Sequence, residues 1–194
     1  MSSGTPTPQS AVVFSDPNCP FCWATEERLH ALGLAGHVRW LGVQHAPELP
    51  VPMVATGRPG GEDLAGEVAS IRSLAPELPI VVPPGKPNTA LAIRWGAAAL
   101  EADPVAGRAF VFDVYRALWT AGADLSDPAI LADLAARHGF GELTPDAQAA
   151  TTDGWWRAWQ RTGRPGVPQL IRRDGQIVYG LAEESVLRAF LGAG

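Results

Sequence analysis

Two cysteines, the only ones in the 194-residue chain, stand three positions apart in the segment Cys19-Pro20-Phe21-Cys22. Paired thiols at this spacing support either thiol–disulfide exchange or the binding of a soft metal such as zinc. In exchange, a thiolate attacks a disulfide sulfur, and a second thiol then resolves the mixed disulfide. The attacking thiol must be exposed and must have a lowered pKa, and its partner must lie within reach.

A zinc site would need further ligands besides the cysteine pair, because structural zinc takes four. The chain has four histidines, and none belongs to a close, ligand-spaced pair: His30, His37, His45 and His138. We therefore expect no metal at the cysteines. We interpret His45 and His138 as surface or capping residues.

The flanking sequence places the pair at the start of a helix. Residues 11–15 form an apolar run of strand length, and a turn-forming Asp-Pro-Asn follows. We expect a helix over 20–32, because proline is favourable at the first helical position. Unpaired N–H groups and the helix dipole favour a thiolate at Cys19 there, whereas Cys22 lies one turn deeper and faces the core. The spacing thus predicts that Cys19 attacks and Cys22 resolves.

The next segment predicts a second strand. Residues 38–43 alternate around Trp40, and a helix joins them to the first strand, so we expect the two strands to be parallel. Residues 46–61 hold four prolines and three glycines and are expected to form a connecting loop.

Helical spacing of apolar residues governs positions 62–162, where no comparable strand pattern occurs. The pattern changes again at two short apolar runs, 168–171 and 176–179, with an Asp-Gly turn signal between them. A helix over 182–191 follows, and we place Val186 on its apolar side.

These patterns divide the chain into two halves of one α/β domain and an insertion. We expect the first half over 11–61, an inserted helical domain over 62–162 and the second half over 163–194. Residues 1–10 are expected to form a flexible tail.

Composition excludes several functional classes. The chain has 15 basic and 20 acidic residues, and this net charge of −5 argues against nucleic-acid binding, which needs a basic face. No apolar run approaches the ~20 residues of a membrane-spanning helix, so we expect no membrane association. The first residues lack the features of a secretory signal, so we expect a cytoplasmic protein. A monomer and a homodimer both fit this composition.

The order strand–helix–strand, helical block, strand–strand–helix, with the cysteine pair opening the first helix, resembles the thioredoxin fold. Proteins of this fold carry a cis-proline that faces the active site just before the third strand, and Gly166-Val167-Pro168 occupies that place. A cis Pro168 would turn the backbone of Val167 toward an extended substrate segment. An ordinary strand-initiating proline is the alternative interpretation.

The helical block inserted after the second strand resembles the DsbA superfamily. Residues 16–23, Asp-Pro-Asn-Cys-Pro-Phe-Cys-Trp, are similar to the active-site stretch of its cytoplasmic FrnE-like branch. Residues 88–90 and 118–128 are similar to helical-domain stretches of hydroxychromene-carboxylate isomerases and kappa-class glutathione transferases. The resemblance, which covers residues 11–192, implies an α/β thioredoxin fold with a helical domain inserted after the second strand.

The resemblance implies a thiol–disulfide oxidoreductase in which Cys19, Cys22 and Pro168 are catalytic. It would exchange disulfides with a protein or a small-molecule thiol through a mixed disulfide at Cys19. No tightly bound cofactor is expected, and a low-molecular-weight thiol would act as co-substrate. The residues expected to contact the substrate flank the catalytic ones: Pro20, Phe21, Val167 and Trp23.

Two carboxylates near the pair are candidates for a proton relay. Asp16 lies three residues before Cys19, but aspartate before proline is also a common turn former, and we favour that role. Glu26 lies one turn beyond Cys22 and could accept its proton if partly buried. A solvated helix position is the simpler interpretation of Glu26.

Three tryptophans precede the Val-Pro segment and have two interpretations. Trp155 and Trp159 form an i, i+4 pair, which favours core packing. Together with Trp156 they would otherwise wall a substrate groove.

Two departures from the relatives leave other functions open. Periplasmic DsbA enzymes often have a histidine between the cysteines, so their oxidising power is not carried over to this chain. The isomerases and kappa-class transferases usually have serine at the nucleophile position and no resolving thiol. A thiol-cofactor-dependent isomerase or transferase is the first alternative function, and a redox-independent binding or chaperone module is the second.

Overall fold

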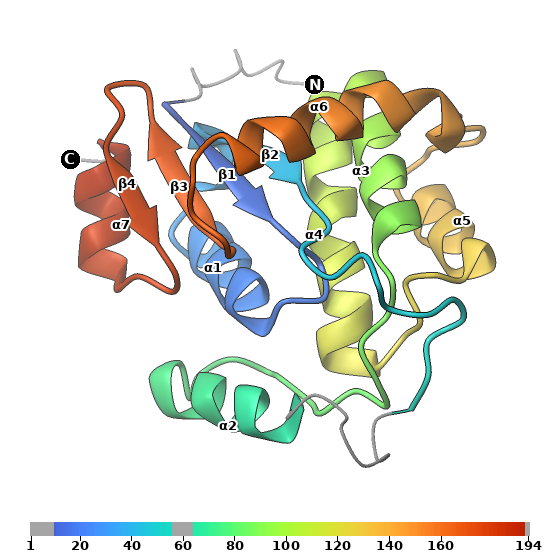
Figure 1. Ribbon diagram of the computed structural model, residues 1–194, viewed down its shortest axis with the longest axis horizontal. Coiled ribbons are helices and arrows are strands. Elements are labelled where there is room, and N and C mark those ends of the chain that lie inside the picture. Colours follow the sequence, from blue (N-terminus) through green and yellow to red (C-terminus); the bar gives the residue numbers. More distant parts are fainter. Residues whose placement is uncertain (1–9, 56–63, 193–194) are drawn as a thin grey trace.

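The computed structural model describes residues 10–55 and 64–192, and Figure 1 shows their arrangement. The expected tail, apart from residue 10, and residues 56–61 of the expected loop lie outside the described residues. The sheet lies on the left in Figure 1, and most of the inserted helices lie beside it on the right.

Four strands form one sheet in the order β2-β1-β3-β4. β1 (Ala11–Ser15) pairs in parallel with β2 (Val38–Gly42) and antiparallel with β3 (Gln169–Arg172), which pairs antiparallel with β4 (Ile177–Tyr179). The parallel pairing of β1 with β2 confirms the prediction, because the connecting helix returns the chain to the same end of the sheet. The β3–β4 turn contains Gly175 at φ +85°, in the left-handed region that favours glycine.

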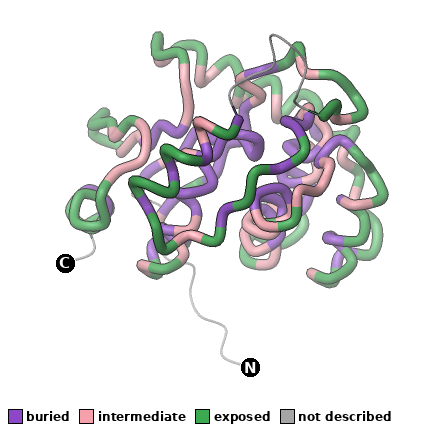
Figure 2. Tube along the Cα trace, turned by 90° about the horizontal axis from the view of Figure 1, so that it is seen from below, coloured by how far each residue is buried: buried purple, intermediate pink, exposed green. Residues whose placement is uncertain are grey.

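One face of the sheet is covered by two helices. α1 (Pro20–Ala31) connects β1 to β2, and α7 (Glu184–Leu191) follows β4. Leu29 of α1 and Leu187 of α7 join one buried cluster with Val13 of β1. In Figure 2 the buried residues lie mainly in the interior and exposed residues surround them.

The helical insertion lies between β2 and β3. Its last helix, α6 (Ala149–Gln160), covers the opposite face of the sheet, where its Trp159 packs against the buried cluster of Phe14, Leu41 and Val43. Figure 1 shows α6 crossing above β1 and β2, and α2 lying below α1. A short 3₁₀ helix, Pro145–Gln148, precedes α6. In the described part of the insertion, the α-helices are α2 (Leu64–Leu74), α3 (Ala90–Ala102), α4 (Pro104–Ala121), α5 (Pro128–Arg137) and α6.

The placement of Val186 on the apolar side of the last helix is wrong. Its side chain is 44% exposed, whereas Leu187, Phe190 and Leu191 of α7 are buried. Those three residues already form a complete stripe at helical spacing, and Val186 lies about 100° away from Leu187 around the helix axis. Apolar spacing alone predicts a buried stripe that is too wide, because it counts Val186 as buried only for being apolar.

Helices α3 and α4 approach each other very closely at Gly107. A β-carbon added there would lie 2.5 Å from the carbonyl carbon and oxygen of Ala99 in α3. Backbone atoms cannot move aside as a flexible side chain can. Gly107 therefore sets the spacing of the two longest helices of the insertion.

We predict that Gly107→Ala destabilises the protein by about 1–3 kcal/mol, because the added methyl overpacks the α3–α4 contact. Gly154→Ala in α6 is the matched control, since a β-carbon there meets nothing within 4 Å. The control should be neutral or raise stability by about 0.5–1 kcal/mol, since alanine favours a helix over glycine. Chemical denaturation of both variants measures the difference. Equal stability of the two variants would show that the helices can move apart freely.

Candidate active site

Cys19 and Cys22 are free thiols at the beginning of α1. Cys19 is the N-cap residue, with extended backbone angles of φ −98° and ψ 120°, and Pro20 takes the first helical position. The Cys19 carbonyl accepts the N–H of Trp23 at 3.0 Å, which closes the first turn. Cys22 is fully buried and Cys19 is only 7% exposed, so the expectation of an exposed attacking thiol is wrong.

The two thiols have pKa values shifted in opposite directions. A hydrogen bond from the Cys22 thiol lowers the pKa of Cys19, and the Cys22 N–H and the charge of His45 add to this effect against burial and Asp16. Burial raises the pKa of Cys22 well above its usual range, and donation of its proton to Cys19 raises it further. Cys19 is thus the thiol that ionises first, and Cys22 keeps the proton.

The Val167–Pro168 peptide bond is cis and faces the thiols. In its protonated form, the Cys19 thiol donates to the Val167 carbonyl oxygen across 3.7 Å. This contact explains the low exposure of Cys19, because a neighbouring backbone segment covers the sulfur. Pro168 is buried and Val167 is half-buried.

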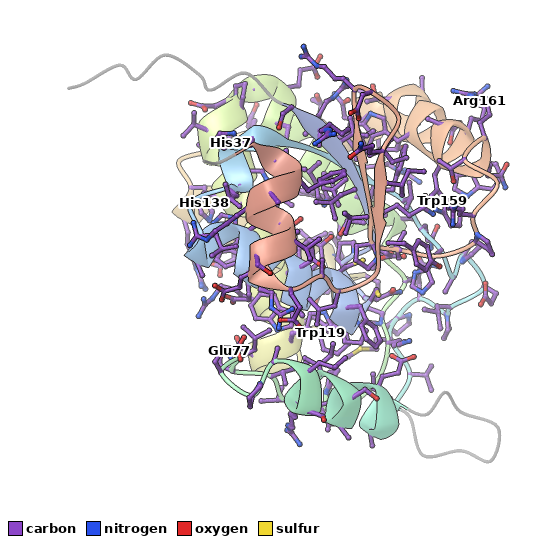
Figure 3. All side chains as sticks on the ribbon, turned by 90° about the vertical axis from the view of Figure 1, so that its left-hand side faces the viewer. His37, Glu77, Trp119, His138, Trp159 and Arg161 are labelled. Atoms are coloured by element: carbon purple, nitrogen blue, oxygen red, sulfur yellow. The ribbon has the colours of Figure 1, made fainter. Side chains whose placement is uncertain are left out.

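Two side chains hold the segment before this bond in place. Trp159 of α6, labelled in Figure 3, donates its indole N–H to the Gly166 carbonyl oxygen at 3.1 Å. The Gln169 amide donates to the same oxygen at 2.6 Å and to the Arg164 carbonyl at 2.9 Å. The insertion and β3 therefore both position the cis peptide beside Cys19.

The Asp16 carboxylate lies at the centre of the polar contacts next to the thiols. It is fully buried, and its Oδ1 accepts from the Asn18 N–H at 3.2 Å and from the Thr89 hydroxyl at 2.7 Å. The contact with the Asn18 N–H is the one expected of a turn-forming aspartate. The contact with Thr89 is not expected of a turn former, and it links Asp16 to the insertion.

His45 completes this polar group, and its interpretation as a surface or capping residue is wrong. Its backbone N–H and its Nδ1 contact Asp16 Oδ2 at 2.8 and 2.7 Å. Burial lowers the pKa of His45, but the hydrogen bond and charge of Asp16 outweigh burial and leave the pKa raised. A cationic His45 in turn favours the Cys19 thiolate. No spacing rule connects a histidine 26 positions away with the cysteine pair, so the sequence offers no signal for this role.

The solvated position favoured for Glu26 is also wrong. Glu26 is fully buried, and one carboxylate oxygen pairs with the guanidinium of Arg108 from α4. Helical spacing alone places Glu26 at the flank of α1, where the insertion covers it. The carboxylate thus joins α1 to the helical block.

Two of the expected substrate contacts are buried instead. Trp23 is fully buried and stacks on Phe112 of α4 with the ring centroids 5.9 Å apart, so it belongs to the core. Pro20 is buried at the start of α1. Phe21 and Val167 are half-buried.

The three tryptophans of α6 have different environments. Trp155 packs edge-on against Trp40 of β2, with 5.8 Å between centroids, and Trp159 binds the Gly166 carbonyl described above. Trp156 is 39% exposed.

Within the described ranges, no three His, Cys, Asp or Glu side chains gather as metal ligands. No helix in the same part of the chain is both long and apolar enough to cross a bilayer.

Solved structures similar to this one come from several proteins with related folds. A probable DsbA oxidoreductase from Streptomyces coelicolor superposes with a TM-score of 0.74 at 18% identity, covering 94% of this chain and 88% of that one. The cytosolic disulfide reductase DsbM from Pseudomonas aeruginosa, solved with GSH, gives 0.72 at 20% identity, covering 94% and 97%. A 2-hydroxychromene-2-carboxylate isomerase gives 0.66 at 18% identity, covering 94% and 93%.

At these identities the likenesses show the fold, an α/β thioredoxin-like fold with a helical insertion between β2 and β3. A search of curated proteins found no match. Residues 11–191 match the protein family described as the DSBA-like thioredoxin domain, which is most of the chain. The chain therefore belongs to the DSBA-like thioredoxin domain family.

Proposed function

We propose that this protein is a thiol–disulfide oxidoreductase that works through Cys19 and Cys22. The observation that carries the proposal is the placement of Cys19 at the N-cap of α1 beside the cis Val167–Pro168 bond, with Cys22 buried one turn deeper. The opposite directions of the two pKa shifts agree with it. The Cys19 thiolate attacks a disulfide, forms a mixed disulfide and releases one substrate thiolate. Cys22 then attacks the Cys19 sulfur, which forms the Cys19–Cys22 disulfide and releases the second substrate thiol. The same steps in reverse reduce the Cys19–Cys22 disulfide. The redox potential of the cysteine pair relative to that of the substrate therefore sets the direction of exchange.

The substrate side of the site consists of Val167, Pro168 and Phe21. The half-buried Val167 backbone beside Cys19 suits an extended segment that adds as a short strand. The likeness to DsbM, whose structure holds GSH, supports a low-molecular-weight thiol as co-substrate and a cytoplasmic location. A protein disulfide is the other substrate class that this backbone contact accommodates.

The Asp16–His45 pair has a defined part in this chemistry. It brings an ionisable imidazole near Cys19 although no histidine stands between the two cysteines. Asp16 raises the pKa of His45 and so favours the imidazolium, whose charge favours the thiolate of Cys19 over the thiol. Asp16 alone would oppose the thiolate, so the favourable effect belongs to the pair.

Cys19→Ser should abolish disulfide exchange, because serine cannot form a mixed disulfide. Cys22→Ser should stop the reaction one step later and accumulate a mixed disulfide at Cys19. Reaction with oxidised glutathione, followed by intact-protein mass spectrometry, detects the added glutathione on Cys22→Ser and its absence on Cys19→Ser. The chain has no other cysteine, so each variant retains one thiol. Turnover by Cys19→Ser would contradict the proposal, and full catalysis by Cys22→Ala would favour the thiol-cofactor alternative.

His45→Asn should raise the pH at which Cys19 ionises, because a charge that favours the thiolate is lost. Thiolate absorbance as a function of pH measures this midpoint. His138→Asn is the matched control, since His138 pairs with Asp113 at 2.9 Å, and neither residue acts on the thiols. An unchanged midpoint in His45→Asn, or an equal shift in the control, would exclude His45 from this role.

A further inference from the structure

A pocket of about 280 Å³ lies between α3, α6 and the end of β2. Its lining includes Arg94 of α3 and three residues of α6: Thr152, Asp153 and Trp156. Concave sites that place a few polar groups among apolar ones are typical of ligand binding, and most have volumes above roughly 300 Å³. The smaller volume of this pocket favours a ligand of about amino-acid size.

The pocket adjoins the active site. Val43, which lines the pocket, belongs to the buried cluster against which Val167 packs, and the Val167 carbonyl accepts from Cys19. Two further lining residues are chain neighbours of the side chains that hold Asp16: Gln44 precedes His45, and Ala90 follows Thr89. A molecule that reacts at Cys19 can therefore extend into this pocket.

Trp156 differs from the other two tryptophans of α6. Trp155 packs on Trp40 and Trp159 binds the Gly166 carbonyl, whereas the side chain of Trp156 is 39% exposed where it lines the pocket. An indole ring offers a large apolar face together with a polar N–H, a combination that is common where proteins bind other molecules. Trp156 therefore suits the wall of a binding site.

Arg94 provides a cation that a ligand can use. Its Nη1 donates to Asp146 Oδ1 at 3.3 Å, with side-chain exposures of 37% for Arg94 and 91% for Asp146. A surface ion pair of this kind contributes little to stability, so a ligand carboxylate can replace Asp146 at small cost. A guanidinium also binds a carboxylate well, because two of its N–H groups can donate to the two oxygens.

Asp153 gives the pocket a charge of the opposite sign. The neighbouring Thr152 hydroxyl donates to the Gln148 and Ala149 carbonyl oxygens, each at 3.1 Å, so its own oxygen is left as an acceptor. A carboxylate beside a hydroxyl oxygen suits an ammonium group, which only donates. The pocket thus presents one cation and one anion to a small ligand.

We propose that this pocket selects small disulfides whose halves each carry a free ammonium and a free carboxylate group, as an amino-acid disulfide does. Arg94 binds the carboxylate, Asp153 and Thr152 bind the ammonium, and Trp156 covers the apolar part. In a protein disulfide both groups are in peptide bonds and carry no charge, so the pocket favours free amino-acid disulfides. This inference rests on the proposed function, since the substrate sulfur reacts at Cys19.

The pocket changes no step of the exchange. Attack by Cys19 breaks the substrate S–S bond, forms the mixed disulfide and releases one substrate thiol. Attack by Cys22 then forms the Cys19–Cys22 bond and releases the other, so two protein thiols are oxidised and one disulfide is reduced. The pocket residues exchange neither electrons nor protons.

Cystine and two of its derivatives test the pocket with the full-length reduced protein. Cystine carries both charges, cystine dimethyl ester lacks the carboxylates, and N,N′-diacetylcystine lacks the ammonium groups. Quenching with N-ethylmaleimide followed by intact-protein mass spectrometry counts the remaining thiols and gives a rate constant for each disulfide. Dividing it by the rate constant of the same disulfide with dithiothreitol corrects for intrinsic reactivity.

The wild-type protein should prefer cystine about ten-fold over each derivative after this correction, because a charge-assisted contact is lost with each. Arg94→Gln should lose most of the preference over the dimethyl ester, and Asp153→Asn most of that over diacetylcystine. Asp146→Asn should increase the preference over the dimethyl ester, because it removes the anion that competes for Arg94. An ion pair with only a structural role would make Arg94→Gln and Asp146→Asn behave alike.

Arg137→Gln is the matched control. Arg137 forms a similar exposed ion pair, with Asp133 on α5, and it does not line the pocket. This variant should keep both the wild-type rate and the wild-type preference.

The proposal is overturned if the wild-type protein reacts with all three disulfides at equal corrected rates, if Arg94→Gln keeps the preference, or if Arg137→Gln loses it equally. Asp146 is highly exposed, so Asp146→Asn tests the pocket even where Arg94→Gln does not fold, and an unchanged or lowered preference there contradicts the proposal. A wild-type protein whose thiols react with none of the three disulfides would instead contradict the proposed function.

Discussion

The placement of Cys19 and Cys22 on α1 is the constraint on which the rest of the site depends. It makes two chemically identical side chains different, because the pKa of Cys19 is lowered and that of the fully buried Cys22 is raised. The difference comes from position on α1: Cys19 caps the helix, and Cys22 lies one turn inside it. Neighbouring groups then strengthen a difference that the helix has already created.

The inserted helices supply much of that neighbourhood. Thr89 at the start of α3 holds Asp16, Arg108 of α4 pairs with Glu26, and Trp119 of α4 donates to the Pro17 carbonyl at 2.8 Å. Figure 3 places Trp119 in the lower part of the molecule, above α2. Each contact reaches the short segment that carries the thiols or the helix after it. The insertion therefore acts as part of the active-site framework as well as a cover for the sheet.

The features that depend on local sequence patterns are predicted well. The strands, the first helix and the parallel pairing of β1 with β2 follow from apolar spacing, from Pro20 and from the length of the connection. Glu26 and His45 were misplaced because their environments depend on Arg108 and Asp16, which lie 82 and 29 positions away from them. The position of Trp23 beside the cysteine motif suggests a contact with the substrate. Its ring stacks instead on Phe112 of α4.

The hydrogen bond between Thr89 and Asp16 also limits how the molecule can move. It is buried, ends on a carboxylate and joins the helical block to the sheet directly beside the thiols. Rotation of the block away from the sheet would break this hydrogen bond, and a buried acceptor that loses its donor is costly. Thr89 therefore couples the position of the helical block to the carboxylate beside Cys19, a residue of which only 7% is exposed. If the protein works as proposed, a disulfide would have to protrude from its own molecule to reach this sulfur.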